Sequence, residues 1–409
     1  MPDQISADLI TPLGAYLRLR DQQPSFLLES VDQGRLGRFS FLGSGSRVVD
    51  AAEAEKTVAS GTPVIGYLGY DHIAGLEPTV SLPMDGRGMP ESAFIVAETL
   101  IRFDHLRGIA EVITGDTLSI TARLAAPVVE PQDRTTTAPG KTERFPEQDT
   151  YEDGVRRAQE HIREGDAFQV VLSQRVVRPT PATAVGLYRA LRRINPSPYL
   201  FLLEFDDLAL IGSSPETMVK LEGSRASLNP IAGTARPEPG AEERLLASEK
   251  DRAEHVMLVD LGRNDLSRVC DAGTVHVDRY LEVEHYSHVI HLVSEVSGVL
   301  KDELNGFDLL RATFPAGTVS GAPKVRAMQI ISEIEGFRRG PYAGAVGYGL
   351  PNGDIDTCIG LRTIFLADGV AHLQAGAGIV ADSDPGAEHE ECLNKLAALE
   401  RAIELVESM

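Results

Sequence analysis

The chain has 409 residues, of which 43% are hydrophobic and 24% charged, a composition typical of a soluble globular protein with one large or two closely joined domains. Its 60 acidic and 39 basic side chains give a formal net charge of −21, which disfavours nucleic acid and anionic membranes as partners. An anionic substrate would therefore need local arginine, lysine, backbone amides or a metal ion.

Cysteine content and hydropathy indicate the compartment. The three cysteines are too few for a disulfide framework and form no C-x-x-C pair, which favours a reducing environment. The N-terminal stretch lacks the basic start and apolar core of a signal peptide, and eighteen apolar residues never run together. We therefore expect a soluble cytoplasmic protein.

The first third of the chain contains apolar runs separated by glycine and proline. The predicted strands cover residues 25–31, 64–71, 110–115 and 118–124. Residues 126–149 are rich in proline, threonine and charge without periodicity, and we interpret them as a surface linker. This linker would separate an N-terminal section, 1–125, from a larger section, 150–409.

The larger section mixes helical and strand patterns without a regular βαβ alternation, which favours an α+β fold with antiparallel sheets. The predicted helices cover 150–164, 248–262, 324–336 and 385–407. The predicted strands cover 165–175, 199–205, 208–214, 217–223, 289–300, 344–350, 358–366 and 372–380.

Two acidic pairs stand out on the predicted helices. Asp251 and Glu254 share one helical face, and Glu388 and Glu391 repeat the spacing, with Lys395 one turn beyond. Solvated acidic faces would explain each pair by itself. Together, four carboxylates from two helices could hold a hard divalent cation such as Mg²⁺, directly or through water.

Other segments suggest anion binding. Gly376 and Gly378 alternate in a predicted strand, where a bulge, tight packing or backbone amides meeting a ligand carboxylate would explain them. Arg362 is a lone cation in an apolar predicted strand, either salt-bridged internally or aimed at a carboxylate. Thr318 lies in a Gly/Ser/Thr loop that feeds a helix starting near Pro323, and a helix N-terminus of this kind accepts anions.

A few titratable residues are ambiguous when taken one at a time. His285, His288 and His291 crowd one segment, although a histidine on a strand is more often structural. Glu216 follows a proline turn, from which a carboxylic acid could project into a cleft.

Taken together, the chain resembles the chorismate-utilising enzymes, and most closely the large, aminase subunit of anthranilate synthase. The segments that carry the resemblance include PIAGTARP, AEHVMLVDLGRNDLSRVC, YSHVIHLVSEVSG, FPAGTVSGAPKVRAMQIISEIEG, RRGPYAGAVGYG, GDIDTCIGLRT, QAGAGIVADSDP and EECLNK, with PSFLLESV, GRFSFLG and GYLGYD in the first third. The chain departs from the family pattern in a shortened stretch before GYLGYD and in GTARPEPG, where a more basic run is usual.

The resemblance implies a two-layer antiparallel β-sandwich core surrounded by helices, which binds chorismate with Mg²⁺. Glu254 and Glu391 match the metal ligands, with Asp251 and Glu388 acting through water, and the ion would hold the ring carboxylate. The residues that match the groups around the substrate are Gly233, Tyr342, Arg362, Gly376, Ala377, Gly378 and, more weakly, Lys395.

The same resemblance assigns catalytic roles. Glu216 matches the general acid that protonates the departing ring hydroxyl, and it must therefore carry a proton. His291 matches the residue that removes a proton as pyruvate is eliminated. Thr234 and Thr318 match threonines that contact the substrate.

Two positions indicate which nucleophile is used. Relatives that add water to chorismate carry a lysine base at the position of Gln169, and an amide has no basic lone pair with which to ionise water. Ammonia needs no such base, so Gln169 favours amination. Ala232 stands where enzymes that aminate the para position often have a lysine, which disfavours that branch.

The resemblance also predicts a tryptophan feedback pocket. The retained residues are Glu29, Ser30, Asn195, Pro196 and Tyr199. Leu200 replaces the more usual methionine, which roughly conserves volume.

The leading hypothesis is an aminase subunit that converts chorismate and ammonia to anthranilate and pyruvate. The alternatives are release of 2-amino-2-deoxyisochorismate without pyruvate elimination, aminodeoxychorismate synthesis, and a catalytically silent regulatory paralogue. No cysteine lies in a G-x-C-x-G turn, so glutamine-dependent activity would need a separate glutamine amidotransferase subunit.

Overall fold

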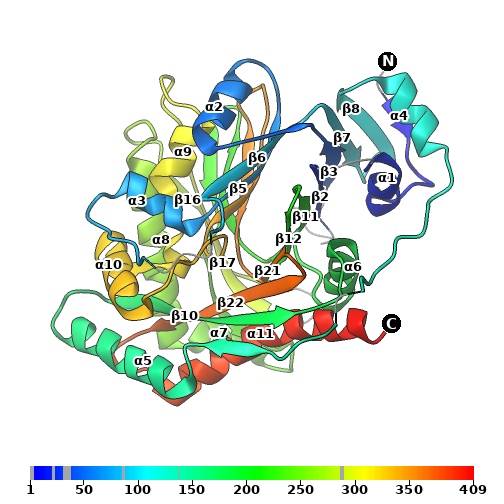
Figure 1. Ribbon diagram of the computed structural model, residues 1–409. Coiled ribbons are helices and arrows are strands. Elements are labelled where there is room, and N and C mark those ends of the chain that lie inside the picture. The colour runs from blue at the N-terminus through cyan, green and yellow to red at the C-terminus, as the bar shows by residue number, and fades with distance from the viewer. Residues whose placement is uncertain (1–3, 21–23, 31–37, 85–87, 137, 286–289) are drawn as a thin grey trace.

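Two antiparallel β-sheets pack face to face, and the helices cover their outer sides (Figure 1). The computed structural model describes residues 4–20, 24–30, 38–84, 88–136, 138–285 and 290–409. Within these residues the first sheet has 12 strands and the second has 10. The α+β class and the two-layer sandwich predicted from the sequence are confirmed.

The first sheet has the strand order β1-β8-β7-β3-β2-β11-β12-β21-β22-β10-β18, and β9 also pairs with β10. Its strands are β1 (Gln4–Ser6), β2 (Ser25–Glu29), β3 (Phe39–Ser44), β7 (Thr99–Asp104), β8 (Ile109–Thr114), β9 (Glu143–Phe145), β10 (Gln169–Pro179), β11 (Tyr199–Glu204), β12 (Leu208–Ser214), β18 (Gly321–Ala322), β21 (Thr363–Ala367) and β22 (Val370–Ile379).

The second sheet has the order β15-β17-β14-β13-β20-β19-β5-β6-β4, and β16 also pairs with β17. Its strands are β4 (Arg47–Val49), β5 (Val64–Leu68), β6 (Ser92–Val96), β13 (Thr217–Glu222), β14 (Arg225–Leu228), β15 (Ile231–Ala235), β16 (His276–His285), β17 (Ile290–Val299), β19 (Ala345–Gly349) and β20 (Ile355–Ile359).

The helices divide between the two outer faces. Those against the first sheet include α1 (Pro12–Leu19), α5 (Gln148–Arg163), α6 (Ala184–Ile194), α10 (Lys324–Glu335) and α11 (Pro385–Glu407). Those against the second sheet include α2 (Ala51–Ala59), α7 (Ala241–Ala247), α8 (Glu249–Ser267) and α9 (Gly306–Thr313). The short elements η1 (Tyr70–His72), α3 (Ile73–Leu76), α4 (Thr117–Leu124) and η2 (Gly317–Val319) complete the described set.

An apolar core fills the space between the two sheets. Phe26, Phe201 and Phe365 of the first sheet pack in one cluster with Ile65 and Val346 of the second. Burying side chains of this size stabilises the sandwich by about 1.5–3 kcal/mol each. Further clusters bury the outer face of each sheet beneath its helices.

The N-terminal and C-terminal sections share both sheets. In the first sheet β2 pairs with β11, and in the second β5 pairs with β19. Residues 126–149, expected as a linker, include β9, which pairs with β10, and the first residues of α5. The two sections therefore complete each other's sheets.

One predicted strand is a helix. Residues 118–124 were predicted as a strand because their apolar residues alternate, but they form α4. Asp116 caps this helix by accepting a hydrogen bond from the backbone N–H of Ser119, and Ile120 and Leu124, one turn apart, are its buried residues. The sequence LSITARL fits both periods, and the N-cap together with packing on α1 selects the helix.

A second prediction was also wrong. Residues 358–366 were predicted as one strand, but β20 ends at Ile359 in the second sheet and β21 begins at Thr363 in the first. Arg362 lies between them with a left-handed φ of 47°. The chain crosses between layers here, so Arg362 is not inside a strand.

The structure bears on two further expectations. Cys270, Cys358 and Cys392 are all free and buried. No helix within the described ranges combines the length and the apolar character needed to span a membrane.

Candidate active site

Two crossings between the sheets bring Glu216 and Arg362 together. Glu216 lies where the chain passes from β12 to β13, and Arg362 lies where it passes from β20 to β21. The backbone N–H of Ile359 donates to the carbonyl of Glu216 at 3.0 Å, and that of Ser213 donates to the carbonyl of Arg362 at 3.2 Å. The two crossings therefore lie side by side, although their residues are far apart in the sequence.

The environment of Glu216 suits a proton donor. Its side chain is buried, and burial raises the pKa of the carboxyl to about 8, although Thr318, Lys395 and Arg362 oppose the shift. The carboxyl is therefore mostly protonated near neutral pH. Burial also lowers the pKa of Arg362, an effect that Glu216 opposes.

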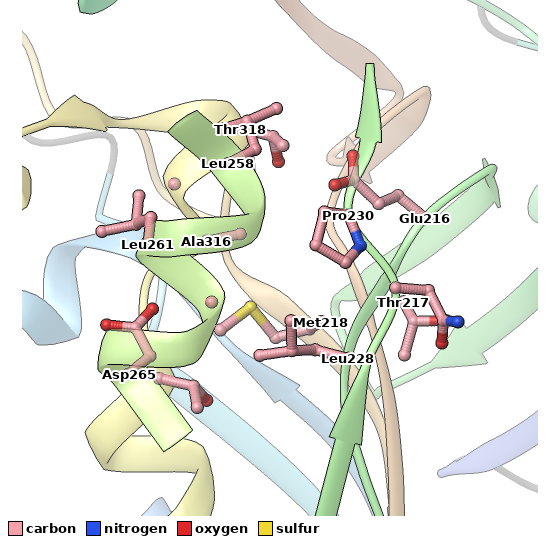
Figure 2. A pocket seen from close by; sticks show the side chains of 14 residues that line it. Glu216, Thr217, Met218, Leu228, Pro230, Leu258, Leu261, Asp265, Ala316 and Thr318 are labelled. Atoms are coloured by element: carbon pink, nitrogen blue, oxygen red, sulfur yellow. The ribbon is translucent and has the colours of Figure 1, made fainter. Parts of the chain in front are cut away.

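A cavity of about 40 Å³ adjoins Glu216, enough for a water molecule. Leu258, Leu261 and Asp265 of α8 form one wall, and Figure 2 shows Glu216 on the opposite wall, beside the strands. Thr318 also lines the cavity.

Gln169 connects the first sheet to α8. Its amide Nε2 donates a hydrogen bond of 3.0 Å to Oε1 of Glu254. The same amide fills the place of a side chain at Gly378, where a Cβ atom would lie 2.5 Å from Nε2. Gln169 is buried, and its Oε1 has no hydrogen-bond partner in the described part of the chain.

The four predicted metal-binding carboxylates lie on α8 and α11. Burial raises the pKa of Glu388 on α11, and Glu391 adds to this shift, whereas Lys250, beside Asp251 on α8, opposes it. Glu391 also forms an ion pair of 2.7 Å with Lys395. The sequence analysis did not single out Lys250, and only its effect on Glu388, which belongs to another helix, reveals it.

Oxygen donors of this kind are the ligands that Mg²⁺ prefers, so the residue types fit the ion. No three of these four carboxylates bring ligand atoms within 4.8 Å of one another in the described residues. The set that meets this limit there is His161, Glu164 and Asp166, where Asp166 already pairs with Arg326.

The strand β22 needs its glycines for close packing rather than for a bulge. Its register with β10 is unbroken, with Gly376 opposite Ser173. A Cβ atom on Gly376 would lie 2.7 Å from the hydroxyl of Tyr342, and the carbonyl of Gly376 accepts a 2.8 Å hydrogen bond from Lys395. Ala377, between the glycines, is buried in a core cluster beneath α5 and α10. Of the predicted substrate groups, Tyr342, Gly376 and Lys395 thus come together.

His291 lies on β17 opposite Thr234 of β15. Its Nδ1 lies 3.3 Å from the carbonyl oxygen of Gly233, which has a left-handed φ of 70° at an irregularity in the pairing. Burial lowers the pKa of His291, so its imidazole is neutral near pH 7 and can accept a proton. Asp251 packs against Gly233, which connects this pair to α8. The side chain of Thr234, and all of His288, lie outside the described residues.

Three of the five predicted feedback residues line one cavity, and two do not. Glu29, Ser30 and Tyr199 line a cavity of about 880 Å³ between the two sheets, but Asn195 and Pro196 do not. The amide of Asn195 donates to Ser213 instead. Tyr199 hydrogen-bonds to Thr217 and Asp356, and Glu29 accepts from Tyr188 and pairs with Arg192.

The fold is one that enzymes acting on chorismate share. The family model of chorismate binding enzymes matches residues 43–401. The chain belongs to this family.

Three similar proteins carry the name of an anthranilate synthase component. "Probable anthranilate synthase component 1" of Schizosaccharomyces pombe is 42% identical, over 99% of this chain and 93% of that protein. Anthranilate synthase component 1 of Thermus thermophilus is also 42% identical, with 98% and 97% covered. The crystal structure of anthranilate synthase component I from Streptococcus pneumoniae has a TM-score of 0.82 at 35% identity, covering 97% of this chain and 98% of that one.

The same fold also serves another reaction. The menaquinone-specific isochorismate synthase of Escherichia coli has a TM-score of 0.79 at 21% identity, with 98% of this chain and 94% of that one covered. The fold alone therefore does not decide which product is formed from chorismate.

Proposed function

We propose that this protein is the aminase subunit of an anthranilate synthase, which converts chorismate and ammonia to anthranilate and pyruvate. The observation that carries the proposal is Gln169, whose amide faces Glu254 where a water-adding relative would need a base. The names of the similar proteins point the same way.

In the first step, ammonia forms a bond to the second ring carbon, the ring double bonds shift, and the ring hydroxyl leaves. Glu216 donates its proton to this hydroxyl, which departs as water, and the raised pKa of about 8 keeps the proton available. The new ammonium group loses a proton to solvent.

In the second step, His291 removes the proton from the ring carbon that carries nitrogen. The enolpyruvyl ether bond breaks, the ring becomes aromatic, and the enolate of pyruvate leaves and takes up a proton from solvent at its methylene carbon. The neutral imidazole suits this role because an imidazolium could not accept the proton.

Tyr342, Arg362 and the backbone of Gly376 and Gly378 would hold the carboxylate of the enolpyruvyl group. Lys395 keeps the Gly376 carbonyl and Glu391 in place through its two contacts.

Glu254 and Glu391 would hold Mg²⁺ directly, with Asp251 and Glu388 acting through water, and the bound ion would neutralise the ring carboxylate. Removal of Mg²⁺ with a chelator should abolish turnover, and added Mg²⁺ should restore it.

Product identification tests the proposal. The purified chain, incubated with chorismate, Mg²⁺ and ammonium, should form anthranilate and pyruvate in equal amounts, measured by mass spectrometry. A hydroxylated product, or no consumption of chorismate, would overturn it. Accumulation of 2-amino-2-deoxyisochorismate without pyruvate would instead support the second candidate function, which is amination without pyruvate elimination. The departure of the GTARPEPG segment from the family pattern favours testing this candidate.

We further propose that ammonia normally comes from a separate glutamine amidotransferase subunit, and that tryptophan binds in the cavity between the sheets. Glutamine alone should give no product with the pure chain. Tryptophan should bind in calorimetric titration and slow turnover, and a Tyr199→Ala substitution in the cavity wall should weaken both effects.

A further inference from the structure

A buried arginine contacts backbone segments that carry residues of the candidate active site. Arg339 is 1% exposed, and its guanidinium donates to both oxygens of Glu335, at 2.9 Å from Nε and 2.6 Å from Nη2. It also donates to the carbonyl of Val319 at 2.8 Å and to that of Val171 at 2.7 Å. One side chain thus joins α10, η2 and β10.

Each carbonyl that Arg339 holds is close to a residue of the site. Val319 follows Thr318, which lines the cavity beside Glu216. Val171 lies two residues after Gln169 on β10. A shift of either carbonyl would therefore move the turn that carries Thr318 or the strand that carries Gln169.

The guanidinium also lies over two tyrosine rings. Its central carbon is 4.7 Å from the ring centre of Tyr70 and 5.6 Å from that of Tyr342. The hydroxyl of Tyr342 fills the space next to Gly376. Arg339 therefore fixes the plane of a ring that points toward the groups expected around the substrate carboxylate.

Glu335 adds a second contact with β10. Its Oε1 accepts from the backbone N–H of Ser173 at 2.8 Å and from the Ser173 hydroxyl at 2.7 Å. Ser173 pairs with Gly376 across the two strands, and Gln374 also donates to its hydroxyl. The carboxylate thus sets the position of β10 relative to α10, and of the glycine strand β22 through its pairing with β10.

The buried ion pair between Arg339 and Glu335 is not favourable for stability by itself. Glu335 is the last residue of α10, where a negative charge opposes the helix dipole. A buried ion pair also loses hydration, and apolar residues of similar volume often replace such a pair without loss of stability. A pair that is unfavourable by itself, yet contacts four parts of one site, indicates a role beyond folding.

We propose that Arg339 and Glu335 are positioning residues that set the relative places of Tyr342, Gly376, Thr318 and Gln169 for chorismate binding. This inference rests on the proposed function. Arginine is required because its planar fork makes these hydrogen bonds while stacking on the rings. A lysine keeps the charge but has neither the fork nor the plane.

Arg339→Lys tests the proposal, with Arg338→Lys as the matched control. Arg338 is the neighbouring arginine, but it lies near the surface and contacts the Pro83 carbonyl and Glu91. We expect Arg339→Lys to raise the KM for chorismate at least tenfold in the ammonia-dependent assay, because the groups that bind the substrate shift. Arg338→Lys should stay within twofold of the wild type.

Separate measurements of KM and kcat distinguish a positioning role from a role in stability. A purely structural role would lower the folded fraction, which reduces apparent kcat and leaves KM unchanged. Thermal unfolding and calorimetric titration of chorismate with Mg²⁺ supply readouts independent of turnover. An unchanged KM and Kd in Arg339→Lys, whatever happens to Tm, would overturn the proposal.

Glu335→Gln provides a milder second variant should Arg339→Lys not fold. It keeps an acceptor for Ser173 but loses the ion pair, and we expect a KM rise of at least threefold; no rise would count against the proposal. The effects of the two substitutions on KM should combine less than multiplicatively, because both disturb one network. A wild-type chain that does not aminate chorismate would overturn the proposed function itself, whereas an active wild type with unaffected variants would overturn only this inference.

Discussion

At the scale of single residues, burial determines what each titratable group of the site can do. The carboxyl of Glu216 lies in apolar surroundings that favour its neutral form, and its pKa is raised to about 8. The imidazole of His291 is buried too, and there the neutral form is the base. One physical effect therefore favours a protonated carboxyl at Glu216 and a neutral imidazole at His291, as the proposed roles of acid and base require.

The raised pKa of Glu216 predicts a pH limit on activity. With free ammonia held constant, kcat/KM should fall as pH rises above about 8, because Glu216 then loses the proton that it donates. Glu216→Gln should lower the rate by about 10²–10⁴-fold and remove this limb of the profile. A profile in the variant that still falls above pH 8 would assign the limb to another group.

The same shift predicts a dependence of stability on pH. The folded protein holds the Glu216 proton more tightly than the unfolded chain, so this residue lowers stability progressively as pH rises from the unfolded pKa to about 8. Glu216→Gln removes this ionisation. Its Tm relative to that of the wild type should therefore be higher at pH 9 than at pH 5, as measured by calorimetry.

Gln169 can be tested as the residue that selects the nucleophile. Gln169→Lys would place an amine beside Glu254 that can deprotonate water, so a hydroxylated product should form from chorismate without ammonia. Gln169→Met is the matched control, since it removes the same hydrogen bond without adding a base, and it should give no such product. If the lysine variant also gives none, this position alone does not choose between water and ammonia.

At the scale of elements, the glycines of β22 have different neighbours, and this predicts different consequences. The atoms nearest to a methyl group on Gly378 would all belong to the side chain of Gln169, whereas a methyl group on Gly376 would meet the backbone carbonyl of Leu172 and the ring hydroxyl of Tyr342. Overpacking against rigid neighbours costs about 1–3 kcal/mol.

We therefore expect Gly376→Ala to lower the free energy of unfolding by about 1–3 kcal/mol. Gly378→Ala should be close to the wild type in urea unfolding, yet lose activity and Mg²⁺ affinity because it pushes Gln169 away from Glu254. Gly75→Ala is the control, since nothing lies within 4 Å of its Cβ position. Equal losses of stability in both strand variants would contradict this account.

At the scale of the whole molecule, the two sections cannot be separated without opening both sheets. The strand pairs β2 with β11 and β5 with β19 join them, and Phe26 and Phe201 share one core cluster. Separation would expose two strand edges together with large apolar side chains.

Residues 126–409 expressed alone should consequently aggregate. A full-length chain cut at a protease site inserted after the exposed Glu130 should remain a single active complex on size-exclusion chromatography. A soluble, active fragment 126–409 would show that the first third of the chain is not needed for folding.

Much of the fold follows from local signals in the sequence. The last helix was predicted over 385–407 and is found at Pro385–Glu407, because Asp384 caps it, proline starts it, and its apolar residues recur with helical period. The strand predicted over residues 118–124 was wrong because LSITARL satisfies the helix and the strand period equally well. Local patterns suffice where only one period fits.

The residue types of the site were readable from the sequence, together with a likeness to known enzymes, but their arrangement was not. The pairing of Gln169 with Glu254, the closeness of Glu216 to Arg362, and the contact of Arg339 with Val171 join segments 85 or more residues apart. Such contacts depend on strand order, register and the points where the chain crosses between sheets. The sequence alone therefore determined which chemical groups are present, and only the tertiary structure decided which of them meet, because sheet pairing is set by packing far along the chain.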